Sequence, residues 1–351
     1  MFKKLEEKLL SLINLDRPIP IQIDITNSCN LSCANCYHSH HNNLGAVDLE
    51  FWQNTLVEYC NLLKKLRCQP FIIICGGEPF ASPLLPQILD SIEAQFGKYV
   101  EIGVITNGTL LKDKDLSSLK KFSNLSLQIS IDGPSAKEHN QLRGSGTFER
   151  TLAGIEAIRN HIPFILATVL SRQNVNQIAS LFDLAKQLGA SGIAFNRLIE
   201  VGSALQTQAQ NSSASLLGKD LKEAFEKIVI ESARTGVATS VDSPLMRLLS
   251  PALGANGRFD EGIVIDYQGY FLASSRSRIR IGSLKDSSLE ALYFSNPIFK
   301  ALRSKKIKVC GSCRLYDTCG GDRNAAYAHN GDYLGHDPGC WLDEISIEKA
   351  N

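Results

Sequence analysis

The sequence predicts an α/β fold: a partial (β/α)6 barrel of the TIM type, followed by a small cysteine-rich C-terminal extension. Between residues 19 and 202, apolar runs of strand length alternate six times with segments of helical periodicity, which indicates a parallel sheet covered by helices. Unusual polar and glycine-rich sequences follow the strand ends, where such folds bind their ligands. We expect an N-terminal helix over 1–18, the barrel over 19–202, a linker and helical segment over 203–258, and the extension over 259–351.

Short apolar runs define the expected strands, and the periodic segments between them define the helices. The strands are expected at 19–25, 70–75, 100–106, 125–131, 163–170 and 192–198. The helices are expected at 49–66, after Pro83, and at 112–122, 147–160 and 175–188. Beyond the barrel we expect a polar loop over 203–220, a helix over 221–235, a turn-rich segment to about 282, and a helix near 287–303.

Composition and charge exclude several classes of protein. Lys and Arg number 37 against 36 Asp and Glu, so the chain has no electrostatic signature of nucleic-acid or anionic-membrane binding. The N-terminus alternates charged residues with leucine and lacks the apolar core of a secretory signal. The aliphatic runs are far shorter than a membrane span. We therefore expect a globular cytoplasmic protein that binds neither nucleic acid nor membrane.

The chain has ten cysteines, and seven of them fall into two groups. In a reducing cytosol, clustered cysteines favour metal binding or catalysis over disulfides. The first group is Cys29-x3-Cys33-x2-Cys36, on one short segment after the first strand. Structural zinc needs four closed ligands, so a zinc site here would need His38, His40 or His41 as the fourth. Three cysteines on a cuboidal iron–sulfur cluster would instead leave one iron open to bind a ligand.

Cys-x3-Cys-x2-Cys after the first strand, with "GGEP" after the second, resembles the radical S-adenosylmethionine (radical SAM) superfamily. The resemblance implies a partial barrel in which Cys29, Cys33 and Cys36 hold a catalytic [4Fe–4S] cluster. The open iron would chelate S-adenosylmethionine, whose reductive cleavage gives a 5′-deoxyadenosyl radical that abstracts a substrate hydrogen. The histidines near the cluster are then expected to be bystanders.

The same resemblance implies contacts to S-adenosylmethionine at the ends of several strands. The "GGE" residues would meet its methionine moiety, and two glycines there would let backbone approach a ligand closely. An arginine would make charge-assisted bonds to its carboxylate. The expected contacts are Tyr37, Gly76, Gly77, Glu78, Thr106, Asn107, Ser130, Arg143 and Asn196.

The second group, Cys310-x2-Cys313-x5-Cys319 with Cys340, supplies four thiols, and four could close a tetrahedral zinc site. The spacing resembles the SPASM and Twitch extensions of radical SAM enzymes, which bind auxiliary [4Fe–4S] clusters. Two cysteines of a full SPASM domain are replaced here, by Ser274 and Arg323. The resemblance therefore implies one auxiliary cluster, fully ligated by the four cysteines. Nearby candidates for taking a substrate proton are Asp322, Asp332, Asp337 and His336.

The resemblance implies an enzyme that modifies a side chain of a ribosomally synthesised peptide. It would need a reductant such as flavodoxin or ferredoxin. Because few residues precede the first strand, we expect a separate leader-peptide-binding protein. The alternatives are side-chain processing of a tetrapyrrole haem precursor, dehydrogenation of an amino sugar or cyclitol, and, outside enzymes, a zinc-binding regulator or scaffold.

Overall fold

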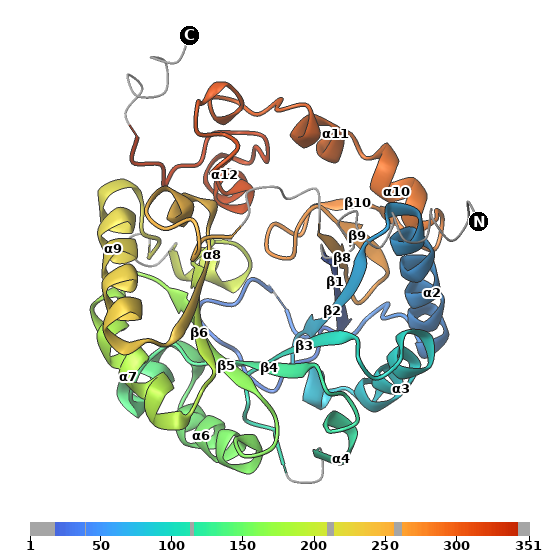
Figure 1. The fold of residues 1–351 in the computed structure, drawn as a ribbon, viewed down its shortest axis with the longest axis horizontal. Coiled ribbons are helices and arrows are strands. Elements are labelled where there is room, and N and C mark those ends of the chain that lie inside the picture. The colour runs from blue at the N-terminus through green and yellow to red at the C-terminus, as the bar shows by residue number, and fades with distance from the viewer. Residues whose placement is uncertain (1–17, 39, 113–115, 209–213, 256–261, 343–351) are drawn as a thin grey trace, which may run out of the picture.

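One continuous sheet organises the computed structural model, which describes residues 18–342 without 39, 113–115, 209–213 and 256–261. Figure 1 shows its strands as an incomplete ring with helices on the outside, and the C-terminal part of the chain along the open side. This arrangement confirms the predicted partial barrel. Of the N-terminal helix expected over 1–18, residues 1–17 lie outside the described residues, and Pro18 begins β1.

Within the described residues, ten strands form the sheet in the order β10-β9-β8-β1-β2-β3-β4-β5-β6-β7. Neighbours from β8 through β1 to β7 run parallel, whereas β8, β9 and β10 pair antiparallel. The strands are β1 (Pro18–Thr26), β2 (Gln69–Gly76), β3 (Glu101–Thr106), β4 (Leu125–Ser130), β5 (Phe164–Leu170), β6 (Gly192–Arg197), β7 (Ala238–Asp242), β8 (Ile263–Ile265), β9 (Tyr270–Leu272) and β10 (Arg280–Ser283).

The helices that connect the barrel strands are α2 (Leu49–Leu66), α3 (Leu84–Phe96), α4 (Leu116–Leu119), α5 (Ala136–Arg143), α6 (Thr147–Ile158), α7 (Ile178–Leu188), α8 (Ser203–Gln208) and α9 (Gly218–Thr235). Figure 1 shows α2, α3, α6, α7 and α9 on the outer surface of the barrel. By contrast, α8 begins against the loop after β1, where the Ser203 N–H donates to the His38 carbonyl at 3.2 Å. The C-terminal part contains α10 (Leu289–Ser295), α11 (Pro297–Arg303) and α12 (Arg323–Asn330). None of the described helices is long and apolar enough to cross a bilayer.

The apolar runs form strands because both faces of the parallel sheet are covered. On β6, the successive residues Ile193, Ala194 and Phe195 are all buried, although their side chains alternate between the two faces of the sheet. A parallel sheet between a filled barrel interior and an outer helix layer needs apolar side chains on both faces of its strands. This requirement explains why the runs read as continuous apolar segments in the sequence.

The structure corrects three expectations beyond β6. Residues 203–208 form α8 where a polar loop was expected, and the segment expected to be rich in turns up to about residue 282 carries β7, β8, β9 and the start of β10. The helix expected near 287–303 is two helices, because Asn296 caps α11 with its side chain and Pro297 opens it. Since β8 pairs with β1, the extension continues the barrel sheet across the expected boundary at residue 258.

Tyr59 of α2 joins the backbones of β1 and β2. Its ring is fully buried, and its hydroxyl donates to the Ile19 carbonyl and accepts from the Phe71 N–H at 3.1 Å. Pro70, which lies opposite Ile19 in the register, has no N–H to offer. The phenol therefore satisfies backbone groups that the ladder leaves unpaired.

We predict that Tyr59→Phe lowers the free energy of unfolding by about 1–3 kcal/mol, because it leaves buried backbone groups without a partner. Urea unfolding under anaerobic conditions measures this as a lower midpoint with an unchanged slope. Tyr99→Phe removes the same hydroxyl at a side chain that is 70% exposed, and should change stability by less than about 0.5 kcal/mol. Equal effects of both substitutions would contradict the role given to Tyr59.

Candidate active site

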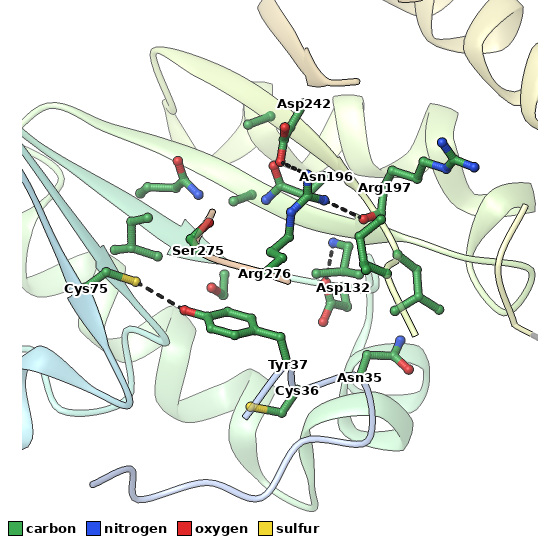
Figure 2. A pocket seen from close by; sticks show the side chains of 18 of the residues that line it. Asn35, Cys36, Tyr37, Cys75, Asp132, Asn196, Arg197, Asp242, Ser275 and Arg276 are labelled. Carbon is green, nitrogen blue, oxygen red and sulfur yellow. Dashed lines mark hydrogen bonds and ion pairs between the residues drawn. The ribbon is translucent and has the colours of Figure 1, made fainter. Parts of the chain in front are cut away.

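The C-terminal ends of the barrel strands surround a cavity of about 550 Å³. Figure 2 shows Cys36 and Tyr37 of the loop after β1 on one side and residues from β6 and β7 on the opposite side, and Cys29 and Cys33 line the cavity as well. Parallel strands bring their C-terminal ends to one rim, which is why segments far apart in the sequence meet here. Of the expected contact residues, the cavity wall includes Tyr37, Gly76, Gly77, Thr106, Asn107, Ser130, Arg143 and Asn196.

Cys29, Cys33 and Cys36 are free thiols that face this cavity. Burial raises the pKa of all three, and that of Cys29 rises to about 11, with further contributions from the Glu78 carboxylate and the other two sulfurs. Buried thiolates repel one another, so these thiols lose their protons readily only when a bound cation compensates the negative charge. The loop is therefore suited to bind a positively charged metal group.

Neither cysteine group converges on a single ion. Among the described residues, no three His, Cys, Asp or Glu side chains are placed to hold one metal ion together. The histidines beside the first group differ in their surroundings: His41 Nε2 lies 3.6 Å from the Cys36 sulfur, and His40 Nδ1 lies 3.0 Å from the Asn27 amide. His38 is buried, and this burial lowers its pKa to about 4, so its ring is neutral.

Arg143 and Asp132 form an ion pair in the cavity wall next to the cysteines. Arg143 Nε lies 2.6 Å from Asp132 Oδ2, while Asp132 Oδ1 accepts from the Val169 N–H at 2.8 Å. The Arg143 guanidinium in turn lowers the pKa of the Cys33 thiol, although burial raises it by more. Sequence reasoning singled out Arg143 but missed Asp132, which stands in the "SIDGP" sequence that follows β4.

The two glycines after β2 are required by packing against β1. A Cβ atom on Gly76 would lie 2.1 Å from the Thr26 carbonyl oxygen, and one on Gly77 would lie 2.2 Å from the Ser28 carbonyl oxygen. Gly76 also has a φ of 127°, which side-chain residues rarely adopt. The glycines thus let β2 run close beneath the start of the cysteine loop, and this contact fixes where the loop begins.

Glu78 lies behind the cavity wall and positions the next loop. Its carboxylate is fully buried and accepts from the Thr106 hydroxyl and the Asn107 N–H, both at 2.7 Å, and from the Phe80 N–H at 3.1 Å. The cavity lining does not include Glu78, in contrast to the direct ligand contact expected from the sequence. Asn107, held in this way, directs its amide toward the Cys29 sulfur at 3.9 Å.

Tyr37 extends from the cysteine loop across the cavity toward β2 (Figure 2). Its hydroxyl lies 3.6 Å from the sulfur of Cys75, and the Arg278 guanidinium lies 6.0 Å from its ring centre. Burial raises the pKa of the phenol well above its ordinary value, so the ring stays neutral. A neutral aromatic face beside the cysteines offers a stacking surface for a planar ligand.

A polar cluster forms the far wall of the cavity, opposite the cysteines. Arg276 Nη2 lies 3.1 Å from Asp242 Oδ2, and Arg276 Nη1 donates to the Arg197 carbonyl at 2.9 Å. Figure 2 shows Arg276 beside Asn196 and Asp242 on this wall. No local pattern in the sequence indicates the Arg276–Asp242 pair, because its members come from segments that only the fold brings together.

Arg197 connects this wall to the C-terminal cysteines. Arg197 is part of the cavity wall, and its guanidinium lies 2.8 Å from Asp337 Oδ1, with both side chains almost fully buried. Asp337 lines a second, smaller cavity, together with Cys310, Cys313, Cys319, Cys340, His336 and apolar side chains that include Leu245, Leu315 and Leu342. The four cysteines expected to act together are therefore brought together. Of the two other aspartates singled out from the sequence, Asp332 forms a surface ion pair with Lys308, and Asp322 is buried and accepts from the Asn324 N–H at 2.9 Å as the N-cap of α12.

Comparison with known proteins agrees with this geometry. The sequence profile of the Radical SAM superfamily matches residues 23–185. The AdoMet-dependent heme synthase of Methanosarcina barkeri is 28% identical over 349 residues, covering 92% of this chain and 96% of that protein. The solved structure of anSMEcpe with bound AdoMet and peptide has the same fold, with a TM-score of 0.70 at 18% identity over 92% of this chain and 94% of that one.

A further relative extends the match to nearly the whole chain. The antilisterial bacteriocin subtilosin biosynthesis protein AlbA of Bacillus subtilis is 30% identical over 339 residues, which cover 95% of this chain and 69% of that protein. The three cysteines after β1 and the Gly-Gly-Glu sequence lie within residues 23–185, which match the superfamily profile. The chain therefore belongs to the radical SAM superfamily.

Proposed function

We propose that this radical SAM enzyme modifies a side chain of a ribosomally synthesised peptide. The observation that carries the proposal is a loop with three cysteines and no fourth, facing a cavity large enough for a cofactor and a substrate group. When bound there, a [4Fe–4S] cluster and S-adenosylmethionine would supply the radical that abstracts hydrogen. The buried thiols, which need a cation to become thiolates, are consistent with such a group.

The residues around the loop would hold and orient S-adenosylmethionine. Arg143, kept in place by Asp132, would bind its carboxylate, and Tyr37 would lie against its adenine ring. Gly76 and Gly77 would present backbone close to its methionine moiety, with Glu78 acting through the Thr106–Asn107 loop that it positions. Ser130 and Asn196 would contact the ribose from the ends of β4 and β6.

We propose that Cys310, Cys313, Cys319 and Cys340 hold one auxiliary [4Fe–4S] cluster. The four thiols are free and line one small cavity whose other walls are largely apolar, which suits a closed group shielded from water. Four cysteines leave no iron open, so this group would support the structure or transfer electrons. Asp337, next to Cys340 and bonded to Arg197, would link it to the substrate cavity.

One feature favours a peptide over a tetrapyrrole substrate. With Arg143 assigned to S-adenosylmethionine, the other arginines in the described part of the cavity wall, Arg197 and Arg276, are each paired with an aspartate. A tetrapyrrole with several carboxylates would need cations that are free to bind them. Relatives point both ways, since AlbA takes part in bacteriocin biosynthesis whereas other matches are heme synthases. Amino-sugar or cyclitol dehydrogenation and a zinc-binding regulator are the remaining alternatives.

The proposed enzyme works in the cytoplasm. All ten cysteines are free, as the reducing cytosol requires. Its partners would be the peptide substrate, a flavodoxin or ferredoxin that supplies electrons, and a separate protein that binds the leader peptide.

Anaerobically reconstituted protein should contain about eight iron atoms per chain and convert S-adenosylmethionine to 5′-deoxyadenosine when reduced with dithionite. Iron analysis and chromatography of the nucleoside measure the two quantities. One or two equivalents of zinc, with no cleavage, would instead support the regulator or scaffold.

Cys33→Ala should lower 5′-deoxyadenosine formation by more than about a hundredfold. Even the replacement of a residue that only hydrogen-bonds a metal ligand lowers metal affinity or activity about ten- to a hundredfold. Cys319→Ala should remove about four iron atoms and spare the cleavage. Cys60→Ala, a thiol on α2 that lines neither cavity, is the matched control and should behave as the parent. Normal cleavage by Cys33→Ala would refute the assignment of the catalytic site.

Iron coproporphyrin III, a carboxylate-rich tetrapyrrole, should remain unchanged when it is incubated with the reduced enzyme and S-adenosylmethionine. Arg197 and Arg276, which are paired with aspartates, leave its carboxylates without partners. Mass spectrometry of the porphyrin is the measurement. A product that has lost carboxyl groups would establish the tetrapyrrole alternative.

A further inference from the structure

Arg323, the first residue of α12, carries a positive charge into the interior beside the C-terminal cysteines. Its side chain is fully buried, at 0% exposure, and a guanidinium stays protonated in proteins. Burying a charge without a partner is strongly unfavourable, so such a group needs an anion nearby. The contacts of Arg323 therefore indicate what the surrounding site is built to hold.

Hydrogen bonds fix the guanidinium in one orientation. Nη1 donates to the Gly335 carbonyl at 2.6 Å and Nε donates to the Gly321 carbonyl at 3.3 Å. The remaining nitrogen, Nη2, points at the sulfur of Cys310 at 3.6 Å. Two neutral carbonyls thus hold the cation, and they direct its free edge at a cysteine.

Gly321 keeps the path between the guanidinium and the sulfur open. A Cβ atom at this position would lie 2.4 Å from Arg323 Nη2 and 3.0 Å from the Cys310 sulfur. Gly321 also has a φ of 73°, which disfavours any residue with a side chain. The contact between Arg323 and Cys310 thus depends on a glycine placed between them.

Arg323 has no carboxylate within 4.0 Å among the described residues, unlike its neighbours. Arg197 is paired with Asp337, and Arg276 is paired with Asp242. The group in contact with Arg323 that can carry negative charge is the Cys310 sulfur. Asp322, the buried acid that precedes Arg323, lies within 4.0 Å of Arg197 and Arg276 instead. A direct anionic contact for Arg323 would therefore come from Cys310 when this cysteine binds a metal group as a thiolate.

We propose that Arg323 raises the reduction potential of the group bound by Cys310, Cys313, Cys319 and Cys340. This inference rests on the auxiliary cluster in the proposed function. Adding one electron makes a thiolate-bound group more negative, and a fixed positive charge in a dry interior stabilises that state more than the oxidised one. Arg323 is thus a tuning residue, which makes the closed site a better electron acceptor.

The test starts from a variant in which Cys29, Cys33 and Cys36 are replaced by alanine, so that only the C-terminal site binds iron. This triple variant is the parent for the substitutions that follow. Iron analysis should give about four atoms per chain. In this background Arg323→Met removes the charge at similar volume, and Arg323→Lys keeps the charge. Arg314→Met removes a charge at an exposed position next to Cys313 and is the control.

The reduced-to-oxidised ratio is measured by electron paramagnetic resonance during a potentiometric titration. Arg323→Met should lower this ratio at least tenfold at a fixed potential, equivalent to about 59 mV for one electron. Arg323→Lys and Arg314→Met should stay much closer to the parent. Loss of iron from Arg323→Met but not from Arg323→Lys would also support a requirement for the charge.

Other outcomes overturn the inference. Equal shifts in the Met and Lys variants, or loss of iron from both, would show that shape matters and charge does not. An unchanged ratio in Arg323→Met would show that the guanidinium has no influence on the bound group. If the parent itself retains no iron, the auxiliary cluster of the proposed function is wrong, and this inference fails with it.

Discussion

The ion pair between Arg197 and Asp337 joins the barrel to the segment that carries the C-terminal cysteines. Arg197 ends β6 and lines the larger cavity, whereas Asp337 lines the smaller one, so the pair forms part of the wall between the two. Gly339 makes room for it, since a Cβ atom there would lie 2.3 Å from Arg197 Nη2. Removing one partner of a buried pair leaves the other charge uncompensated, at a cost of about 3–5 kcal/mol. The relative position of the two cysteine groups therefore depends on this contact.

The larger cavity is built from charges that already have partners, and this limits what it can bind. Arg143 with Asp132 and Arg276 with Asp242 place neutral pairs on opposite sides. The cysteines are the exception, because burial raises the pKa of their thiols and only a cationic group would stabilise the thiolates. Because the charges in the walls are paired and the thiols of the loop after β1 are not, a metal group would bind at that loop. The substrate would then be selected by hydrogen bonding and by shape.

Sequence reasoning predicted what local patterns encode. The apolar runs located the strands from β1 to β6, and the spacing from Cys29 to Cys36 located the metal-binding loop. The pairing of β8 with β1 was missed, because the two strands are more than two hundred residues apart and no local pattern in the sequence indicates which strands pair. The ion pairs were missed for the same reason: Asp132 and Asp242 are ordinary acidic residues until the fold brings an arginine to each. Glu78 was expected to contact a ligand. The local sequence does not distinguish an acid that is hydrogen-bonded behind the cavity wall from one that faces the cavity.

Position 323 shows how a departure from a family pattern can acquire a role of its own. The resemblance to SPASM domains marks it only as a missing cysteine. In the structure its arginine extends from the start of α12 back to Cys310, while the neighbouring Asn324 hydrogen-bonds the hydroxyl of Ser274, at the other replaced position. Polar contacts thus fill the space between these two positions. A buried cation that cannot lose its proton is stable only where an anionic group completes the site. The replacement of a cysteine by Arg323 thus removes a ligand of one cluster and places a positive charge beside the four cysteines of the other.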